Sequence, residues 1–90
     1  MRLALDFDDT YTRDPELWDK FIEWAKERGH EVICVTMRYP YEIELDRHQF
    51  PKGVEIYATS RSAKYLYLLN KGIHVDVWID DDPMWLYRNG

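Results

Sequence analysis

Four short apolar runs, spread over only 90 residues, constrain the fold of this chain more than any other feature. They are Leu3–Leu5, Glu31–Thr36, Val54–Thr59 and Val75–Ile79, and the second is nearly continuous, as in strands covered on both faces. Segments with helical signals separate them, which gives the order βαβαβαβ and favours a parallel sheet with right-handed crossovers. We therefore expect one α/β domain over residues 1–90. Its fold should be a minimal Rossmann-like three-layer fold, with a four-stranded parallel sheet, flanking helices and no cap domain.

The first helix has clear signals at both of its ends. Asp14 can cap the amino end, with Pro15 at the first helical position, and Gly29 can take the left-handed stop after Arg28. Apolar residues recur at spacings of three and four, which predicts one broad face packed on the sheet. These residues are Leu17, Trp18, Phe21, Ile22, Trp24 and Ala25.

Two further helices are expected between the remaining strands. One runs from Tyr41 to Gln49, before the chain breaks in the stretch from Phe50 to Gly53. The other follows the third strand, starts at a cap provided by Ser60 or Ser62, and ends at Gly72. The residues expected on its apolar face are Ala63, Leu66, Tyr67 and Leu69.

Composition limits the classes of protein to which this domain can belong. Hydrophobic residues make up 46% of the chain, which is ample for a packed core and argues against disorder. Cys34 is the only cysteine, which excludes an intramolecular disulfide and a multi-cysteine zinc site and predicts a buried apolar role. The amino terminus has too few apolar residues for a signal peptide, and no apolar run approaches the length of a membrane span. We expect a soluble, cytoplasmic protein with no membrane partner.

Charge is distributed unevenly along the chain. The net charge of −5 is unfavourable for a nucleic-acid coat protein, which needs a basic face. Six of the seventeen acids fall in two tight groups, so a bound divalent cation would remove much of the local repulsion. The groups are Asp6, Asp8 and Asp9, and Asp80, Asp81 and Asp82.

Asp6 and Asp8 carry the strongest chemical signal. They follow the first apolar run directly, and their spacing of two residues points them to the same side of the chain. Because open α/β sheets bind ligands at the carboxyl ends of their strands, paired acids there must bind a cation or change their protonation. We expect other polar residues to meet them at this edge: Thr36, Lys64, Asp80 and Asp81.

This ordered set resembles the haloacid dehalogenase-like (HAD) hydrolase superfamily. The pattern is Asp-x-Asp-x-Thr after a strand, a strand ending in Thr36, Lys64 on a helix, and an apolar strand ending in Asp80 and Asp81. It covers nearly the whole chain, which the resemblance identifies as a single HAD-like catalytic core domain. The resemblance implies an Mg²⁺-dependent phosphatase, a phosphoric monoester hydrolase that works through an aspartyl-phosphate.

The resemblance also implies roles for the acidic residues. Asp6 would be the nucleophile that attacks phosphorus, and Asp8 would be the general acid and then the general base. Mg²⁺ would bind the Asp6 carboxylate, the Asp8 backbone carbonyl and Asp80, with Asp81 helping through water or hydrogen bonds. Asp8 favours a phosphatase over a dehalogenase, while a phosphotransferase remains an alternative.

Four other residues complete the implied site. Thr36 would donate to a phosphoryl oxygen, and Lys64 would stabilise negative charge on the phosphoryl group. Taken singly, Thr36 is also typical of a strand and Lys64 of a solvated helix. Thr10 and Arg38 are candidate substrate-binding residues, and Arg38 could hold a second phosphate or the leaving group, although a lone loop arginine is more often merely solvated.

Residues around the site give weaker signals. Asp82 is left out of the site, because it precedes a proline that can start a helix. Aromatic side chains near the edge of the site could stack on a base or a peptide, although such residues more often pack in the core. They are Tyr11, Tyr39 and Tyr41.

The chain departs from the family pattern in two respects. Members commonly have Gly at the position of Asp9, and many carry a cap domain. Here only Tyr11–Arg13 separates the first motif from its helix, and the stretch from Met37 to Gly53 is also too short for a lid. An open site suits a large phosphorylated substrate, such as a nucleic-acid end or a phosphoprotein. A neighbouring subunit of a homo-oligomer could serve as the lid instead.

Two other classes stay open as alternatives. A receiver-like signalling domain also places acids, Thr and Lys at strand ends, but its lysine follows the last strand, whereas Lys64 precedes the final acids. The second alternative is a catalytically weak or inactive HAD-like module that binds Mg²⁺ or phosphate and acts through interactions. Phosphate release in the presence of Mg²⁺ distinguishes the enzyme from this module.

Overall fold

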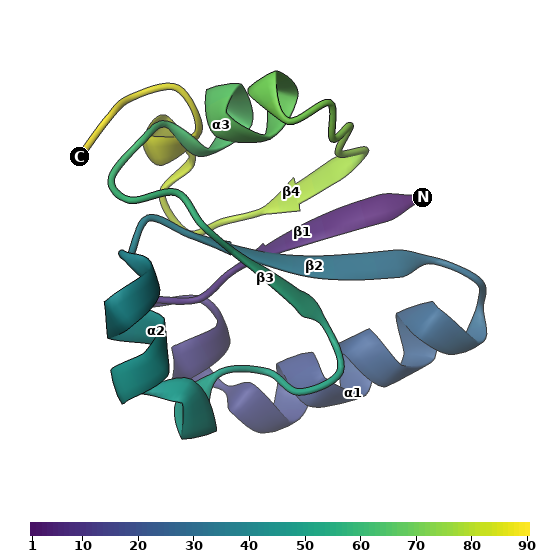
Figure 1. Cartoon of the computed structure of the whole chain (residues 1–90). Helices are drawn as coiled ribbons and strands as arrows, with labels where there is room; N and C mark the ends of the chain where they lie inside the picture. The colour runs from purple at the N-terminus through teal and green to yellow at the C-terminus, as the bar shows by residue number, and fades with distance from the viewer.

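The four expected strands form one parallel sheet in the computed structural model, which describes all of residues 1–90 (Figure 1). They are β1 (Arg2–Asp6), β2 (Glu31–Thr36), β3 (Glu55–Ala58) and β4 (Val77–Ile79). Their spatial order is β3-β2-β1-β4, and every pairing is parallel. The predicted fold class is therefore confirmed. β3 and β4 are shorter than the apolar runs that predicted them.

The register of the sheet explains why polar residues from distant parts of the chain meet. Asp6 at the end of β1 pairs with Val35 on one side, and Leu5 pairs with Ile79 on the other. Thr36 closes β2 opposite Ala58. Because all four strands run in one direction, the residues that follow them emerge along a single edge of the sheet.

Helices cover both faces of the sheet, with α1 (Pro15–Glu27) and α2 (Pro40–Leu45) on one face and α3 (Lys64–Asn70) on the other (Figure 1). Side chains alternate along β1, so Leu3 and Leu5 pack toward α1 while Ala4 packs toward α3. Cys34 is fully buried in the larger of the two cores, as expected. None of the helices has the length and hydrophobicity that a membrane span requires.

The ends of α1 match the sequence signals, but its apolar face is narrower than predicted. The Asp14 carboxylate accepts a hydrogen bond from the Leu17 N–H at 3.1 Å, and Gly29 takes a positive φ of 84°. Leu17 and Trp24, expected on the buried face, are 54% and 68% exposed. Periodicity alone overestimated the buried face, because one thin sheet covers only part of a helix's circumference.

The helix predicted from Tyr41 to Gln49 is wrong as a single element. α2 ends at Leu45, and a separate 3₁₀ turn, η2, spans Arg47–Gln49. The break falls at Asp46, whose carboxylate bonds to Arg38. Only Ile43 of α2 is buried, so packing provides little to extend the helix.

The start and the buried face of α3 also differ from expectation. Neither Ser60 nor Ser62 caps the helix; the residue before it is Ala63, whose N–H donates to Asn89 Oδ1 at 2.8 Å. Leu68 is the leucine of α3 that is fully buried. Leu66 and Leu69, expected in the core, are about half exposed because this short helix contacts the sheet along a different line.

Candidate active site

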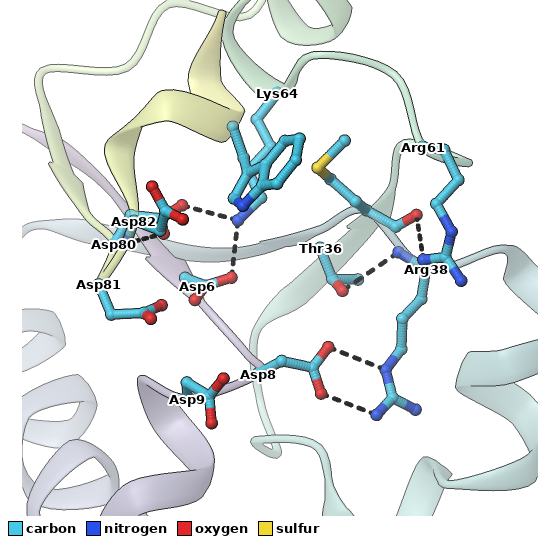
Figure 2. Close-up of a pocket in the computed structure, with 12 residues that line it drawn as sticks. Asp6, Asp8, Asp9, Thr36, Arg38, Arg61, Lys64, Asp80, Asp81 and Asp82 are labelled. Carbon is cyan, nitrogen blue, oxygen red and sulfur yellow. Dashed lines mark hydrogen bonds and ion pairs between the residues drawn. The ribbon is translucent and has the colours of Figure 1, made fainter. Parts of the chain in front are cut away.

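A polar cavity of about 240 Å³ lies at the carboxyl edge of the sheet. In Figure 2, acidic side chains from the ends of β1 and β4 line one side, two arginines line the other, and Lys64 lies between them. The lining is strongly polar, with Met37 and Trp85 as its two hydrophobic members. The others are Asp6, Asp8, Asp9, Thr36, Arg38, Arg61, Lys64, Asp80, Asp81 and Asp82.

Lys64 joins the ends of two strands. Its Nζ lies 2.6 Å from Asp6 Oδ1 at the end of β1, and 2.7 Å from Asp80 Oδ2 after β4. All three side chains are buried. The structure therefore brings together three residues that the sequence placed at separate strand and helix ends. We call Lys64, Asp6 and Asp80 the buried cluster.

Thr10 adds a hydroxyl group to this arrangement. Its Oγ1 lies 2.9 Å from Asp6 Oδ2 and 3.1 Å from Asp81 Oδ1, and it accepts a hydrogen bond from the Asp81 N–H at 3.2 Å. One hydroxyl proton can serve only one carboxylate at a time. Thr10 itself is buried and does not line the cavity, so the structure places it as a support for the acids.

The acids of this region form a set that could hold a metal ion. Asp6, Asp80 and Asp81 each offer one carboxylate oxygen, and these oxygens all lie within 4.8 Å of one another. Such hard oxygen donors suit cations like Mg²⁺. The single ammonium group of Lys64 leaves part of their negative charge uncompensated, and a divalent cation would compensate it.

Burial and neighbouring charge shift the pKa values of this region. Burial raises the pKa of Asp6 to about 7, although the charge of Lys64 opposes the shift. Burial alone would lower the pKa of Lys64, but the adjacent Asp6 and Asp80 carboxylates outweigh burial and raise it. Lys64 is therefore a cation at neutral pH, and a bound cation would favour the ionised form of Asp6.

The Asp8 side chain points away from the buried cluster and toward a second cation, Arg38. Arg38 holds both of its oxygens, with Nε 3.0 Å from Oδ2 and Nη2 2.8 Å from Oδ1 (Figure 2). Arg38 Nη1 also bonds Asp46 Oδ2 at 2.6 Å, and the guanidinium lies over the rings of Phe7 and Phe50. These hydrogen bonds, led by those to Asp8, raise the pKa of Arg38. We call Arg38, Asp8 and Asp46 the outer cluster.

The remaining predicted residues fall in different places. Thr36 is buried at the end of β2, lines the cavity, and accepts a hydrogen bond from the Arg38 N–H at 3.3 Å. Tyr11, expected at the site edge, is instead buried in the core, and its hydroxyl donates to Asp19 at 2.7 Å. Asp82, left out of the site, lines the cavity, and its N–H donates to Asp80 Oδ1 at 3.0 Å.

Asp9 occupies the position at which the resembling family commonly has Gly. Its φ of 64° is left-handed, a conformation that Gly adopts freely and that Asp tolerates better than most residues. The N–H of Asp9 donates to Thr12 Oγ1 at 3.0 Å, which supports the tight turn after β1.

Two residues of the cavity region gave no usable motif in the sequence. Arg61 lines the cavity from the segment between β3 and α3, and Asp46 holds Arg38 from beyond α2. The position of Arg61 just past the end of β3 was the one signal that could have identified it.

The cavity thus combines three features: the buried Asp6 carboxylate in contact with Lys64, a candidate metal-binding set, and three basic side chains. Such an arrangement is suited to binding a phosphoryl group. No protein-family model, curated protein or solved structure matches this chain.

Proposed function

We propose that this protein is an Mg²⁺-dependent phosphomonoester hydrolase that forms an aspartyl-phosphate on Asp6. The observation that carries the proposal is the buried cluster, in which Lys64 contacts both Asp6 and Asp80 beside a third carboxylate, Asp81. The order of the corresponding motifs, which resembles that of HAD-like hydrolases, also supports it.

Asp6 has the environment that a nucleophilic carboxylate requires. It lies at the end of the inner strand β1, is fixed by Lys64 and Thr10, and faces a cavity wide enough to admit a phosphoryl group. In the first step, an Asp6 oxygen bonds to phosphorus while the ester P–O bond breaks. Lys64 stays beside the reacting carboxylate and offsets the negative charge that the phosphate brings.

Asp8 would transfer the protons of both steps. After turning from Arg38 and taking up a proton from solvent, it donates that proton to the departing ester oxygen. It then accepts a proton from the water that attacks phosphorus, so that the Asp6–phosphate bond breaks and inorganic phosphate leaves. Because Arg38 holds both Asp8 oxygens, the carboxyl group must turn from Arg38 toward the leaving oxygen. The bond from Arg38 to Asp46 keeps the guanidinium in place during that movement.

Asp6, Asp80 and Asp81 would hold Mg²⁺, with the Asp8 backbone carbonyl as a further ligand. When bound, Mg²⁺ supplies the positive charge that lets an anionic carboxylate approach an anionic phosphate. The chain itself supplies the hard oxygen donors and the cavity around them.

The test is phosphate release from a panel of monoesters, with Mg²⁺ and with EDTA. The panel contains sugar phosphates, nucleotides, phosphorylated oligonucleotides and phosphopeptides. We expect Mg²⁺-dependent release that beryllium fluoride inhibits, and release near background for a folded Asp6→Asn variant. The matched control is Asp76→Asn, because Asp76 lies just before β4, at the opposite end of that strand, and this variant should keep its activity.

Two outcomes would contradict the proposal. Retained activity in Asp6→Asn would exclude Asp6 as the nucleophile. If no monoester is hydrolysed, and Asp6→Asn changes only the affinity for Mg²⁺ in calorimetry, the protein is instead a binding module. The hold of Arg38 on Asp8 is the observation that favours this second candidate.

A further inference from the structure

Two tyrosines and one arginine form an exposed stack beside the cavity. The rings of Tyr39 and Tyr41 are 5.9 Å apart between centroids and nearly parallel, at 16°. The Arg61 guanidinium lies 5.3 Å from the centroid of the Tyr39 ring. Tyr39 is 39% exposed and Tyr41 is 65% exposed, and neither belongs to a core cluster. We call Tyr39, Tyr41 and Arg61 the aromatic step.

The aromatic step begins at the rim of the cavity. Arg61 lines the cavity directly, and Tyr39 follows Arg38, which also lines it. Figure 2 shows Arg38 and Arg61 together on the side away from Asp80 and Asp81. A substrate bound at Asp6 would reach the tyrosines when its leaving group leaves the cavity on the side of these two arginines.

Hydrogen bonds hold Tyr39 and Arg61 of the aromatic step in place without a ligand. Glu42 Oε1 accepts from the Tyr39 N–H at 2.8 Å, and both Glu42 oxygens lie 3.2 Å from Arg61 Nη2. The Arg61 N–H donates to the Met37 carbonyl at 2.8 Å. Ser60 and Arg61 both adopt left-handed backbone, with φ of 53° and 69°. Strained backbone of this kind persists where the surroundings hold it firmly, and it is concentrated at binding sites.

We propose that the aromatic step binds the leaving group of the substrate, and that the substrate is the phosphorylated end of a single-stranded nucleic acid. Exposed aromatic faces stack on nucleobases of any sequence, and a guanidinium beside them meets the phosphodiester charge. Arg61 lies over the Tyr39 ring, and the Tyr39 ring lies beside the Tyr41 ring, so a guanidinium stands next to flat faces as a phosphate stands next to a base along such a strand. A peptide backbone offers no charge in that pattern. Arg38 is paired with Asp8 and Asp46, and Arg61 with Glu42, so the exposed rings carry this proposal more than the positive charge does.

The inference rests on the proposed function for hydrolysis, but its test includes a binding measurement that needs no turnover. The probe is a short oligothymidylate with a terminal phosphate and a fluorescent label at the other end. Its affinity is measured by anisotropy with Mg²⁺ and the Asp6→Asn variant, so that no phosphate is lost. Tyr41→Ala is then added to that background, with Leu45→Ala as the matched control, because Leu45 is 74% exposed on the same helix.

We expect Tyr41→Ala to weaken oligothymidylate binding by about 5- to 150-fold, the range for loss of one base stack, and Tyr41→Phe to restore most of it. Leu45→Ala should leave the affinity unchanged. In the active protein, the ratio of kcat/KM for the oligonucleotide to that for ribose 5-phosphate should fall by a similar factor in Tyr41→Ala, mainly through KM.

Three other results would lead to different conclusions about the substrate or the catalysis. If Tyr41→Ala lowered kcat/KM equally for the oligonucleotide and for ribose 5-phosphate, the proposed role of the aromatic step would be wrong, while the proposed phosphatase activity would stand. If Tyr41→Ala lowered kcat/KM more for a phosphotyrosine peptide than for the oligonucleotide, the nucleic-acid substrate would be wrong and a peptide substrate would be favoured. Tyr41-dependent oligonucleotide binding without any hydrolysis would support the aromatic step and contradict the proposed catalysis.

Discussion

The buried cluster and the outer cluster use the same elements, one cation between two carboxylates, in very different surroundings. The side chains of Lys64, Asp6 and Asp80 are 4%, 8% and 4% exposed, whereas that of Asp8 is 52% exposed. Water screens the outer pairs but hardly reaches the buried ones. In the proposed mechanism, the buried cluster would hold the nucleophile in place, and the outer cluster would release Asp8, which has to move.

The two cations also differ in shape. The ammonium group of Lys64 is a compact point charge that can contact carboxylates from two strands at once. Arg38 presents a planar fork that matches both oxygens of Asp8. Exchanging the two side chains would give neither geometry.

The largest predicted effect comes from removing the buried cation. Lys64→Met keeps the length of the side chain but leaves Asp6 and Asp80 without their shared cation. We expect a loss of about 3–5 kcal/mol in the free energy of unfolding, measured by urea denaturation at pH 8 in EDTA. The control is Lys52→Met on the surface, and a loss below about 1 kcal/mol in Lys64→Met would break the contrast between the clusters.

Alkaline titration sharpens the same contrast. The pKa of Lys64 is raised above its ordinary value of 10.5, so its contribution to stability is complete below 10.5 and is lost as the pH rises through the folded-state value. The gap in unfolding free energy between the wild-type protein and Lys64→Met should therefore narrow in strongly alkaline solution. The gap between the wild-type protein and an Arg38 variant should stay constant, because a guanidinium does not titrate there. If both differences in unfolding free energy changed with pH in the same way, the loss of stability could not be assigned to deprotonation of Lys64.

A smaller effect is expected at the outer cluster. Arg38→Lys keeps the charge but loses the two-pronged contact with Asp8, and we expect a cost of about 1 kcal/mol that shrinks in 1 M salt. Thermal unfolding at low and high salt measures it. A cost as large as that of Lys64→Met would show that exposure does not separate the two clusters.

The smallest effect is expected in the turn between the clusters. Asp9→Gly relieves the left-handed strain at φ 64° but adds freedom to the unfolded chain, so we expect a change within about 1 kcal/mol. Asp9→Val should cost more, because a β-branched residue is strongly disfavoured at positive φ. Urea denaturation of both variants checks the order, and equal stabilities would contradict the strain argument.

The sequence predicted the sheet and the acids at its edge because both depend on short-range patterns. Apolar runs mark the strands, and parallel strands carry the residues after them to one edge, so Asp6, Thr36 and Asp80 could be placed without knowing any contact. Helix faces depended on tertiary packing instead. Leu66 and Leu69 are exposed while Leu68 is buried, since the sheet decides which line of a short helix it covers.

The partners of the site residues could not be read from the sequence for a related reason. Asp46 interrupts the predicted second helix and holds Arg38, but an acid in a helix-like stretch gives no sign of a long-range contact. Arg61 takes left-handed backbone, which sequence patterns associate with Gly or Asn rather than with Arg. Both depend on loops meeting in space, which periodicity does not describe.

The position of β4 in the sheet has a mechanical consequence. It is a three-residue edge strand, hydrogen-bonded to β1 alone, yet it delivers Asp80 and Asp81 to the cavity. An edge strand opens more easily than the strands within a sheet. A cation bound by both Asp6 and Asp81 would link the inner strand β1 to the edge strand β4. Binding of a cation in the cavity should therefore slow the hydrogen exchange of the β4 amides.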